Sequence, residues 1–222
     1  LWILGGIQFI DLGVKIIEGN ILINSIALLG ILWSVNLFNF LDGIDGYISM
    51  EIIFICFSAF ILFNHQILLV LMASVIGFLI WNWQPAKIFM GDVGSTLLGY
   101  TIAIIAIHYQ NQSVSSLIFW IIITSLFWYD ATYTLIRRLF NKEKIFHPHK
   151  KHAYQRMVIA GYSAQKTVIY ALLVNIIIFF IAFLSIEFKQ YKLYFLLIDL
   201  LFLSIIMSKI NKISPFSFKK NE

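Results

Sequence analysis

The sequence predicts an all-α membrane protein, a polytopic bundle of about seven transmembrane helices with a partial helix before them. Of its 222 residues, 60% are hydrophobic and 12% are charged, whereas soluble domains carry about a quarter charged residues. Seven apolar runs come close to the roughly 20 residues that cross a bilayer. The single Cys56 excludes a disulfide framework.

The apolar runs define the expected spans in order along the chain. They lie at residues 21–39, 47–64, 66–83, 95–109, 116–136, 166–186 and 191–208, and a partial span is expected at 1–10. No repeat, low-complexity segment or linker separates them, so we expect a single domain over 1–222. Because the first residues belong to an apolar run and the first residue is Leu rather than Met, we also expect the N-terminal part to be incomplete.

Basic residues alternate between the loops and give the expected orientation. The loops after the third and fifth runs and the C-terminal segment hold 13 of the 16 Lys and Arg residues, and the opposite side holds three. Loops rich in Lys and Arg stay in the cytoplasm. Four of the six aspartates, Asp42, Asp45, Asp92 and Asp130, lie at or near that side. We therefore expect one shared site at the cytoplasmic face.

The segment NLFNFLDGIDG, residues 36–46, ends the first run with amides and carboxylates. Asn36, Asn39 and Asp42 are spaced by three residues, which places them on one helical face, and Asp45 continues the series. The glycine after each aspartate permits a positive φ or a close backbone approach. The alternative is a polar helix end with an ordinary turn. Carboxylates at a membrane boundary favour a functional role.

The segment FMGDVGST, residues 89–96, precedes the fourth run. Asp92 is flanked by glycines, and Ser95 is expected to cap the helix that follows. A helix N-terminus attracts anions, and a carboxylate beside it can hold a divalent cation, so phosphate and metal could meet here. The alternative is a glycine turn with an N-cap.

The loop after the fifth run contains HPHKKHAYQR, residues 147–156. Its histidines, His147, His149 and His152, stand among lysines and an arginine. Zinc is disfavoured because the loop has no cysteine and the neighbouring cations would repel a metal. Basic residues with histidine suit a phosphate-bearing ligand better.

Asp130 and two arginines precede this loop. Asp130 lies inside the fifth run, seven residues before Arg137 and on the same helical face, so we expect it to pair with or orient a polar group. Arg137 and Arg138 are expected to bind the anionic ligand. The alternative, positive-inside topology alone, suffices for the other loop lysines.

Carboxylates and basic groups on one membrane face suit phosphoryl transfer from a polar donor to a lipid, with Mg²⁺ and cationic side chains neutralising charge. In order and approximate spacing, the three segments resemble motifs of the polyprenyl-phosphate N-acetylhexosamine-1-phosphate transferases (glycosyltransferase family 4). That family includes phospho-MurNAc-pentapeptide transferase and UDP-GlcNAc:undecaprenyl-phosphate GlcNAc-1-phosphate transferases. The resemblance implies transfer of an N-acetylhexosamine 1-phosphate from a UDP-sugar to undecaprenyl phosphate, with release of UMP. This step would begin cell-surface polysaccharide synthesis at the bacterial inner membrane.

The resemblance also implies residue roles. Asp92 would bind Mg²⁺, with Mn²⁺ as an alternative. The expected catalytic residues are Asp42, Asp45, His149 and His152. The residues expected to bind the nucleotide and diphosphate are Asn36, Asn39, Asp42, Asp45, Arg137 and Arg138. No nucleic-acid partner is predicted.

One departure leaves alternatives open. The family carries a pair of adjacent aspartates ahead of these motifs, and this chain has no adjacent pair. The alternatives are an inactive fragment, or a half that needs a separate N-terminal partner chain or a homodimer. A proton-coupled transporter is less favoured, because such carriers place their polar groups near the bilayer midplane.

Overall fold

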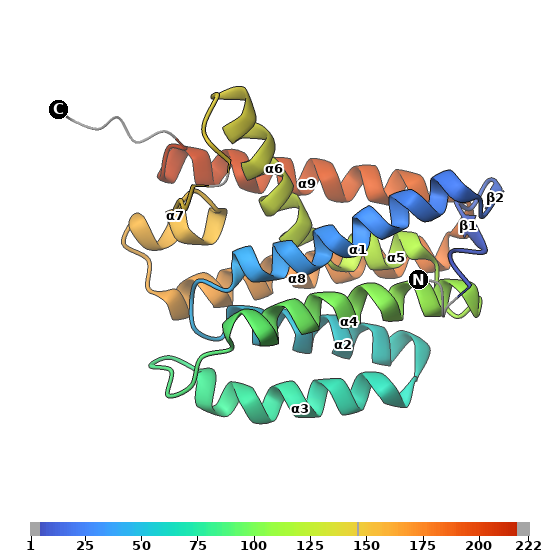
Figure 1. Cartoon of the computed structure of the whole chain (residues 1–222), viewed down its shortest axis with the longest axis horizontal. Coiled ribbons are helices and arrows are strands. Elements are labelled where there is room, and N and C mark those ends of the chain that lie inside the picture. The colour runs from blue at the N-terminus through green and yellow to red at the C-terminus, as the bar shows by residue number, and fades with distance from the viewer. Residues whose placement is uncertain (1–4, 146, 217–222) are drawn as a thin grey trace.

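A computed structural model describes residues 5–145 and 147–216 of the chain. The described part is almost entirely helical (Figure 1). The elements are β1 (Phe9–Asp11), β2 (Ile16–Glu18), α1 (Ile21–Leu41), α2 (Tyr47–Phe63), α3 (Gln66–Asn82), α4 (Gly91–Asn111), α5 (Leu117–Ile123), α6 (Ser125–Phe140), α7 (Ala153–Ile159), α8 (Ala164–Glu187), the short 3₁₀ helix η1 (Lys189–Tyr191) and α9 (Lys192–Ile213). The predicted all-α fold class is confirmed, with one small hairpin added.

All seven apolar runs form helices, but their number as membrane spans stays a prediction. Within the described residues, four helical segments are long and apolar enough to cross a membrane: α1, α4, α8 and η1 with α9. The bent pair α5 and α6 makes a fifth if counted as one span. The two remaining helices, α2 and α3, have 17 residues each.

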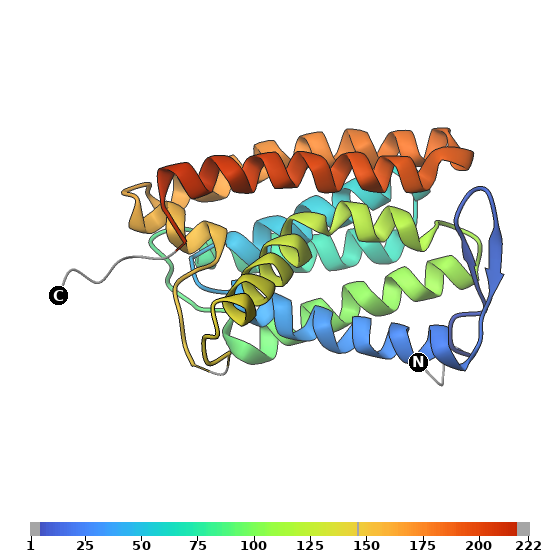
Figure 2. The same ribbon diagram turned by 90° about the horizontal axis from the view of Figure 1, so that it is seen from above.

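The long helices lie side by side and place the connecting loops at two ends. α1 packs on α4, α2 on α3, and α8 on α9; Figure 2 shows α8 with α9 on one flank and α1 with α4 on the other. At the left end of Figure 1 lie the end of α1, the start of α4, α7 and the end of α9. The loops that hold the predicted site residues therefore share one end of the bundle.

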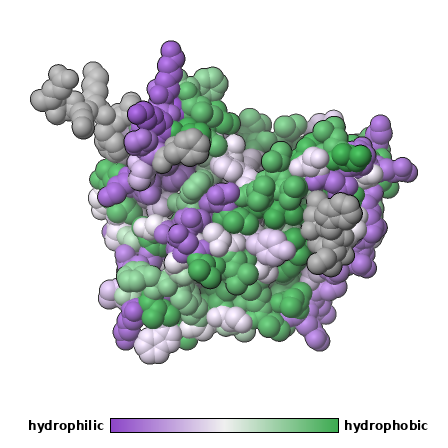
Figure 3. Space-filling view, in the orientation of Figure 1, coloured by the Kyte–Doolittle hydropathy of each residue, from purple (hydrophilic) through white to green (hydrophobic). Residues whose placement is uncertain are grey.

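The helices are apolar on their outer faces as well as in the core. Large core side chains such as Phe38, Phe119 and Phe127 are fully buried. Outward-facing Ile21 and Phe140 are 88% and 83% exposed, and Figure 3 shows hydrophobic residues over much of the middle of one face, with hydrophilic residues toward the two ends. Helices that are apolar all round belong in a membrane or a large core.

The expected partial helix at residues 1–10 is wrong for the described residues 5–10; residues 1–4 lie outside the described part. β1 pairs antiparallel with β2, with Ile10 opposite Ile17. Gly6 and Gly13 adopt φ values of +74° and +87°, which interrupt an apolar run that composition alone suggests is helical. Lys192 holds the hairpin through an ion pair with Asp11.

The run at 116–136 is not one continuous helix, since a bend of 72° separates α5 from α6; whether the pair forms one span stays a prediction. Side chains bond two of the carbonyl groups beside the break: Thr124 Oγ1 donates to Trp120 O and Trp128 Nε1 donates to Ile121 O, both at 2.7 Å. Such bonds allow a helix to break inside a membrane protein. As a result, α6 leaves the bundle at an angle (Figure 1).

Candidate active site

The turn between α1 and α2, residues 42–46, carries two of the predicted carboxylates. Asp42 follows α1 directly and donates its backbone N–H to Asn39 O at 3.3 Å. Gly46 has φ +77° at the start of α2, and a Cβ on Gly43 would overlap Tyr154 Oη. The positive φ and close approach expected of these glycines are both present. We call residues 42–46 the acidic turn.

Asn82, at the end of α3, organises the acidic turn and was missed in the sequence. Its Oδ1 accepts from Gly46 N at 3.0 Å and from Ser49 Oγ at 3.3 Å, while its Nδ2 donates to Ile88 O at 3.0 Å. One buried amide thus joins the turn to the loop at 83–90. The sequence feature that could have identified Asn82 is its place as a lone amide at the end of an apolar run, where polar side chains favour a functional role.

The carboxyl group of Asp42 is affected by the two other carboxylates expected at the site. Burial, and then the charges of Asp92 and Asp45, raise the pKa of Asp42 to about 6. Asp45 Oδ2 accepts from Ala86 N at 3.2 Å. In the described part of the chain, no hydrogen bond or ion pair involves the carboxylate of Asp42 or of Asp92. These two groups keep their oxygens available for a ligand.

The expected N-cap at Ser95 is wrong, because α4 begins at Gly91, where φ is +66°. Ser95 therefore lies inside the helix, where Oγ donates to Gly91 O and to Asn39 Oδ1, each at 3.2 Å. Asn39 thereby joins α1 to the first turn of α4, beside Asp92. Asn36 is exposed, and its amide donates to Leu32 O of its own helix at 2.7 Å.

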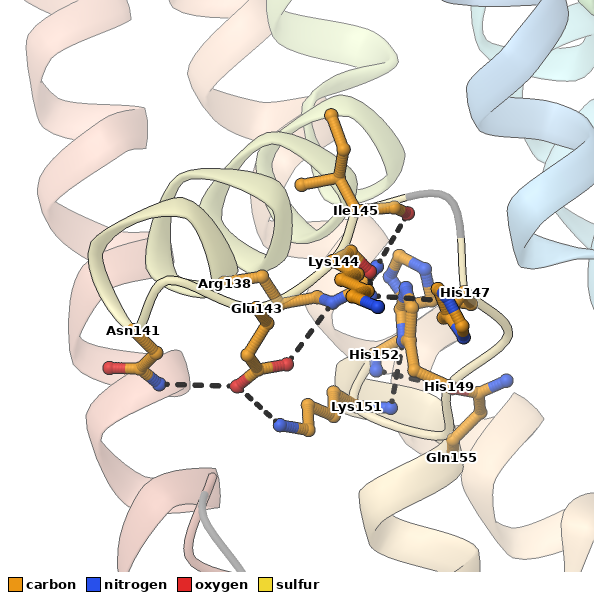
Figure 4. A network of polar contacts seen from close by, with 10 residues as sticks. All are labelled: Arg138, Asn141, Glu143, Lys144, Ile145, His147, His149, Lys151, His152 and Gln155. Carbon is orange, nitrogen blue, oxygen red and sulfur yellow. Dashed lines mark hydrogen bonds and ion pairs between the residues drawn. The ribbon is translucent and has the colours of Figure 1, made fainter.

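Arg138 shapes the loop between α6 and α7 (Figure 4). Its guanidinium donates to Lys144 O at 2.6 Å, Ile145 O at 3.0 Å and His147 O at 3.1 Å, and pairs with Glu143 at 3.3 Å. Only 4% of its side chain is exposed. The guanidinium N–H groups of Arg138, which were expected to bind a ligand, are therefore largely occupied by hydrogen bonds within the loop.

Arg137 points to the end of α9. It donates to Tyr133 Oη at 2.8 Å and Asn211 Oδ1 at 3.0 Å, and lies 4.6 Å from the ring centre of Phe216. Asn211 Oδ1 also accepts from buried Arg156 at 2.7 Å. These contacts tie α6 and α7 to α9.

Asp130 orients the histidine segment, as expected. Both its oxygens accept from Ala153 N at 2.9 Å, at the first residue of α7. Thr134 Oγ1 donates to Oδ1 at 3.2 Å, and His152 Nδ1 lies 3.8 Å from the same oxygen. A buried carboxylate on α6 therefore fixes the start of α7.

His149 and His152 lie together, with ring centres 4.9 Å apart. Burial, then the neighbouring His152, Arg138 and Lys151, lowers the pKa of His149 to about 4. Lys151 N donates to His149 Nδ1 at 3.3 Å, which assigns the proton of the neutral ring to Nε2. His149 can thus donate a hydrogen bond without carrying charge.

The histidine segment meets the end of α1. The ring of His152 stacks on Phe40 with centres 6.5 Å apart and on Tyr154 at 6.1 Å. Tyr154 Oη donates to Phe40 O at 3.2 Å. Since Phe40 precedes Asp42 by two residues, the histidines and the acidic turn belong to one region.

Two cavities adjoin this region. A pocket of about 480 Å³ has a largely apolar lining with polar groups from Arg138, His149 and His152. An apolar groove of about 390 Å³ runs between α1, α4, α5 and α6, and Trp33 lines both cavities. The pair could hold a ligand with an anionic head and a long apolar chain.

The acidic residues fit a partial metal site. Within the described residues, no group of three or more His, Cys, Asp or Glu side chains is arranged to hold a metal ion. Mg²⁺ is commonly bound by one or two carboxylates together with waters and substrate phosphates. The available oxygens of Asp42 and Asp92, beside the helix N-terminus at Gly91, are compatible with that mode.

Comparison with known proteins gives consistent matches. Residues 1–110 match the family model of glycosyl transferase family 4. The chain is 35% identical over 161 residues to the probable undecaprenyl-phosphate N-acetylglucosaminyl 1-phosphate transferase of Bacillus subtilis (strain 168), covering 67% of this chain and 45% of that protein. It is 39% identical over 92 residues to the phospho-N-acetylmuramoyl-pentapeptide-transferase of Thermotoga neapolitana, covering 39% and 30%. For the undecaprenyl-phosphate alpha-N-acetylglucosaminyl 1-phosphate transferase of Thermotoga maritima, identity is 32% over 121 residues, covering 54% and 38%.

These matches confirm the resemblance expected from the three motifs. The matched segment covers less than half the length of each of these relatives. The matches and the apolar helices together identify a multi-pass membrane protein.

Proposed function

We propose, from the match to glycosyl transferase family 4, that the chain belongs to this family and transfers an N-acetylhexosamine 1-phosphate from a UDP-sugar to polyprenyl phosphate, releasing UMP. The observation that carries the proposal is that three features adjoin one another. The acidic turn and the pocket lined by His149 and His152 lie at one end of the bundle, and the apolar groove runs from the other end to meet that pocket at Trp33.

The two cavities suit the lipid substrate. The apolar groove would take part of the polyprenyl chain, because its lining is almost wholly hydrocarbon, including Ile31, Phe38 and Ile102. The adjoining pocket would take the phosphate, with Nε2–H of His149 donating to a phosphate oxygen. Arg138 adds positive charge beside the pocket while holding the loop.

The acidic turn suits the nucleotide-sugar. Asp92 and Asp42 would hold Mg²⁺, or Mn²⁺ in its place, and a bound divalent cation would neutralise charge on the diphosphate during attack by the lipid phosphate. Asp45 is fixed by Ala86 N, and Asn39 is fixed through Ser95. The chain's own contribution is to position two anions in one region.

The site would face the cytoplasm of the bacterial inner membrane, since Lys and Arg concentrate at that end. The test replaces Val93, which is 83% exposed beside Asp92, with cysteine. An impermeant thiol reagent should leave Val93→Cys unlabelled in intact cells and label it after the membrane is opened. Labelling in intact cells would reverse the orientation.

The proposed reaction is tested by measuring UMP and lipid-linked sugar in membranes supplied with Mg²⁺, undecaprenyl phosphate and a UDP-N-acetylhexosamine. UDP-GlcNAc is the first donor, because two matched relatives carry N-acetylglucosaminyl in their names. One preparation contains the chain alone. A second also contains the parts of the Bacillus subtilis protein that the chain does not match, which would supply any required partner segment. Absence of both products from both preparations, with other UDP-N-acetylhexosamines also tried, would overturn the proposal.

A further inference from the structure

A polar pair lies inside the bundle, away from every group assigned above. Asn175 of α8 donates from Nδ2 to Glu51 Oε2 of α2 at 2.6 Å, and each residue is 2% exposed. Glu51 is six residues beyond Asp45 and one helical turn beyond Tyr47. Among the described residues, no ion pair involves Glu51, so no cation offsets a charge on it.

Two oxygens of the pair lack partners. Glu51 Oε1 and Asn175 Oδ1 are buried and have no hydrogen bond within the described structure. A cavity of about 10 Å³ lies beside them, close to the lower limit of about 10–15 Å³ that admits one water molecule. Its lining comes from both helices: Tyr47, Met50, Glu51, Val168, Ala171, Leu172 and Asn175.

Burial without a cation decides the protonation state of Glu51. If Glu51 were ionised, its two oxygens and Asn175 Oδ1 would all be acceptors; a water in the cavity could donate to the two that lack partners, but the negative charge would stay buried without a cation. A buried carboxylate without a cation is costly. If Glu51 is protonated on Oε1, it gains a donor, and a water can accept from it and donate to Asn175 Oδ1.

We propose that Glu51 is uncharged and that Glu51 and Asn175 together bind one water molecule in this cavity, forming a neutral link between α2 and α8. The hydrogen bonds would run from Asn175 Nδ2 to Glu51 Oε2, from Glu51 Oε1–H to the water, and from the water to Asn175 Oδ1. Every buried polar atom of the pair then has a partner.

The link makes Glu51 a positioning residue for the acidic turn, a consequence that rests on the proposed function. Tyr47, which lines the cavity, begins α2 directly after the turn. Its ring packs on Tyr154 with centres 5.1 Å apart, and Tyr154 contacts Gly43 and Phe40. The register of α2 against α8 therefore sets where Asp42 and Asp45 stand relative to the histidines.

The protonation is tested by infrared spectroscopy of the purified chain at pH 7, with carbon-13 glutamate. A carbonyl band of a protonated glutamic acid is expected, and it should disappear in Glu51→Gln and persist in the exposed matched control Glu187→Gln. Oxygen-18 water should perturb a band from the bound water. In the unchanged protein the isotope assigns the band to a glutamic acid even if a variant does not fold, and Glu51 is the buried glutamate of the described residues. Carboxylate bands alone, or no response to labelled water, would overturn the proposal.

The positioning role is tested by UMP release in the active preparation. Glu51→Gln keeps a neutral hydrogen-bonding side chain, so its rate should stay within about threefold of the wild type, whereas Glu51→Ala and Asn175→Leu should lose on the order of ten- to a hundredfold and need more Mg²⁺ for half-maximal rate. Equal loss in Glu51→Gln and Glu51→Ala would contradict the neutral link. Failure of the proposed function is distinct, because it would remove UMP release from the wild type and leave the infrared result unchanged.

Discussion

The acidic turn and the histidine loop lie at the same end of the bundle but use their polar groups differently. The carboxylates of Asp42 and Asp92 take part in no hydrogen bond or ion pair within the described structure. At the loop that holds the histidines, residues 141–152, Arg138 of α6 donates to three backbone carbonyls. Asp130 of α6 accepts from Ala153 N. The carboxylates of Asp42 and Asp92 are therefore available to a ligand, whereas Arg138 and Asp130 hold the backbone in place.

The difference separates residues that sequence motifs group together. Arg138 and Asp42 were both expected to contact the ligand, but only Asp42 keeps its side-chain oxygens available. His149 is the exception in its loop, since its Nδ1 accepts a backbone hydrogen bond and its Nε2 carries a donor. A substitution of Asp42 or Asp92 should therefore lower activity while the protein stays folded. A substitution of Arg138 or Asp130 should lower stability, and activity should fall as a consequence.

The largest effect is expected at Asp92. Asp92→Asn removes a proposed metal ligand worth several kcal/mol of charge stabilisation, so UMP release should fall by about a hundredfold or more. The thermal unfolding midpoint should not fall, because the substitution also removes a charge that raises the pKa of Asp42. The matched control is Glu18→Gln, an exposed carboxylate in the hairpin. Full activity in Asp92→Asn would remove the metal assignment.

The next effect is expected at Asp130, and it should be structural. Asp130→Ala leaves Ala153 N without its acceptor, which costs about 1–3 kcal/mol, so both thermal stability in detergent and UMP release should drop. An activity loss with unchanged stability would place Asp130 in the chemistry and break the comparison.

A smaller effect is expected at Arg138. Arg138→Lys keeps the charge but cannot make the forked contacts to Lys144 O, Ile145 O and His147 O. Limited proteolysis should cut the loop at 141–151 faster than in the wild type, with UMP release reduced about tenfold or less. Unchanged proteolysis would show that these bonds do not order the loop.

The spacing of residues 36–46 predicted the acidic turn because the positive φ of Gly46 is a local requirement, whereas the close approach at Gly43 involves the distant Tyr154. Asp130 was expected to orient a polar group, but its partner, Ala153 N, lies 23 residues away and could not be identified from a pattern. The break at Thr124 was missed because apolar residues continue on both sides of it. Ser95 was misplaced because φ at Gly91, rather than the serine, sets where α4 begins.

The smallest expected effect concerns pH. The pKa of Asp42 is raised from 3.8 to about 6, so the folded chain is more stable below pH 4 on this account and loses that contribution as pH rises to 6. At pH values above 6, Asp42→Asn should therefore have a higher thermal unfolding midpoint than the wild type. Near pH 4 the two midpoints should be equal. Mg²⁺ should stabilise the wild type above pH 6 more than it stabilises the variant. The opposite pH trend would contradict the raised pKa of Asp42, which burial causes first and the charges of Asp92 and Asp45 second.

The central claim is that Asp42 of the acidic turn and Asp92 of α4 bind the ligand's metal, while the buried Arg138 and Asp130 beside the histidines act as scaffold. The most direct measurement is Mn²⁺ binding by electron paramagnetic resonance, in the presence of UDP-GlcNAc, for the wild type, Asp92→Asn and Asp130→Asn. Binding should be lost or strongly weakened in Asp92→Asn and retained in folded Asp130→Asn. Retention in Asp92→Asn with loss in folded Asp130→Asn would contradict the account.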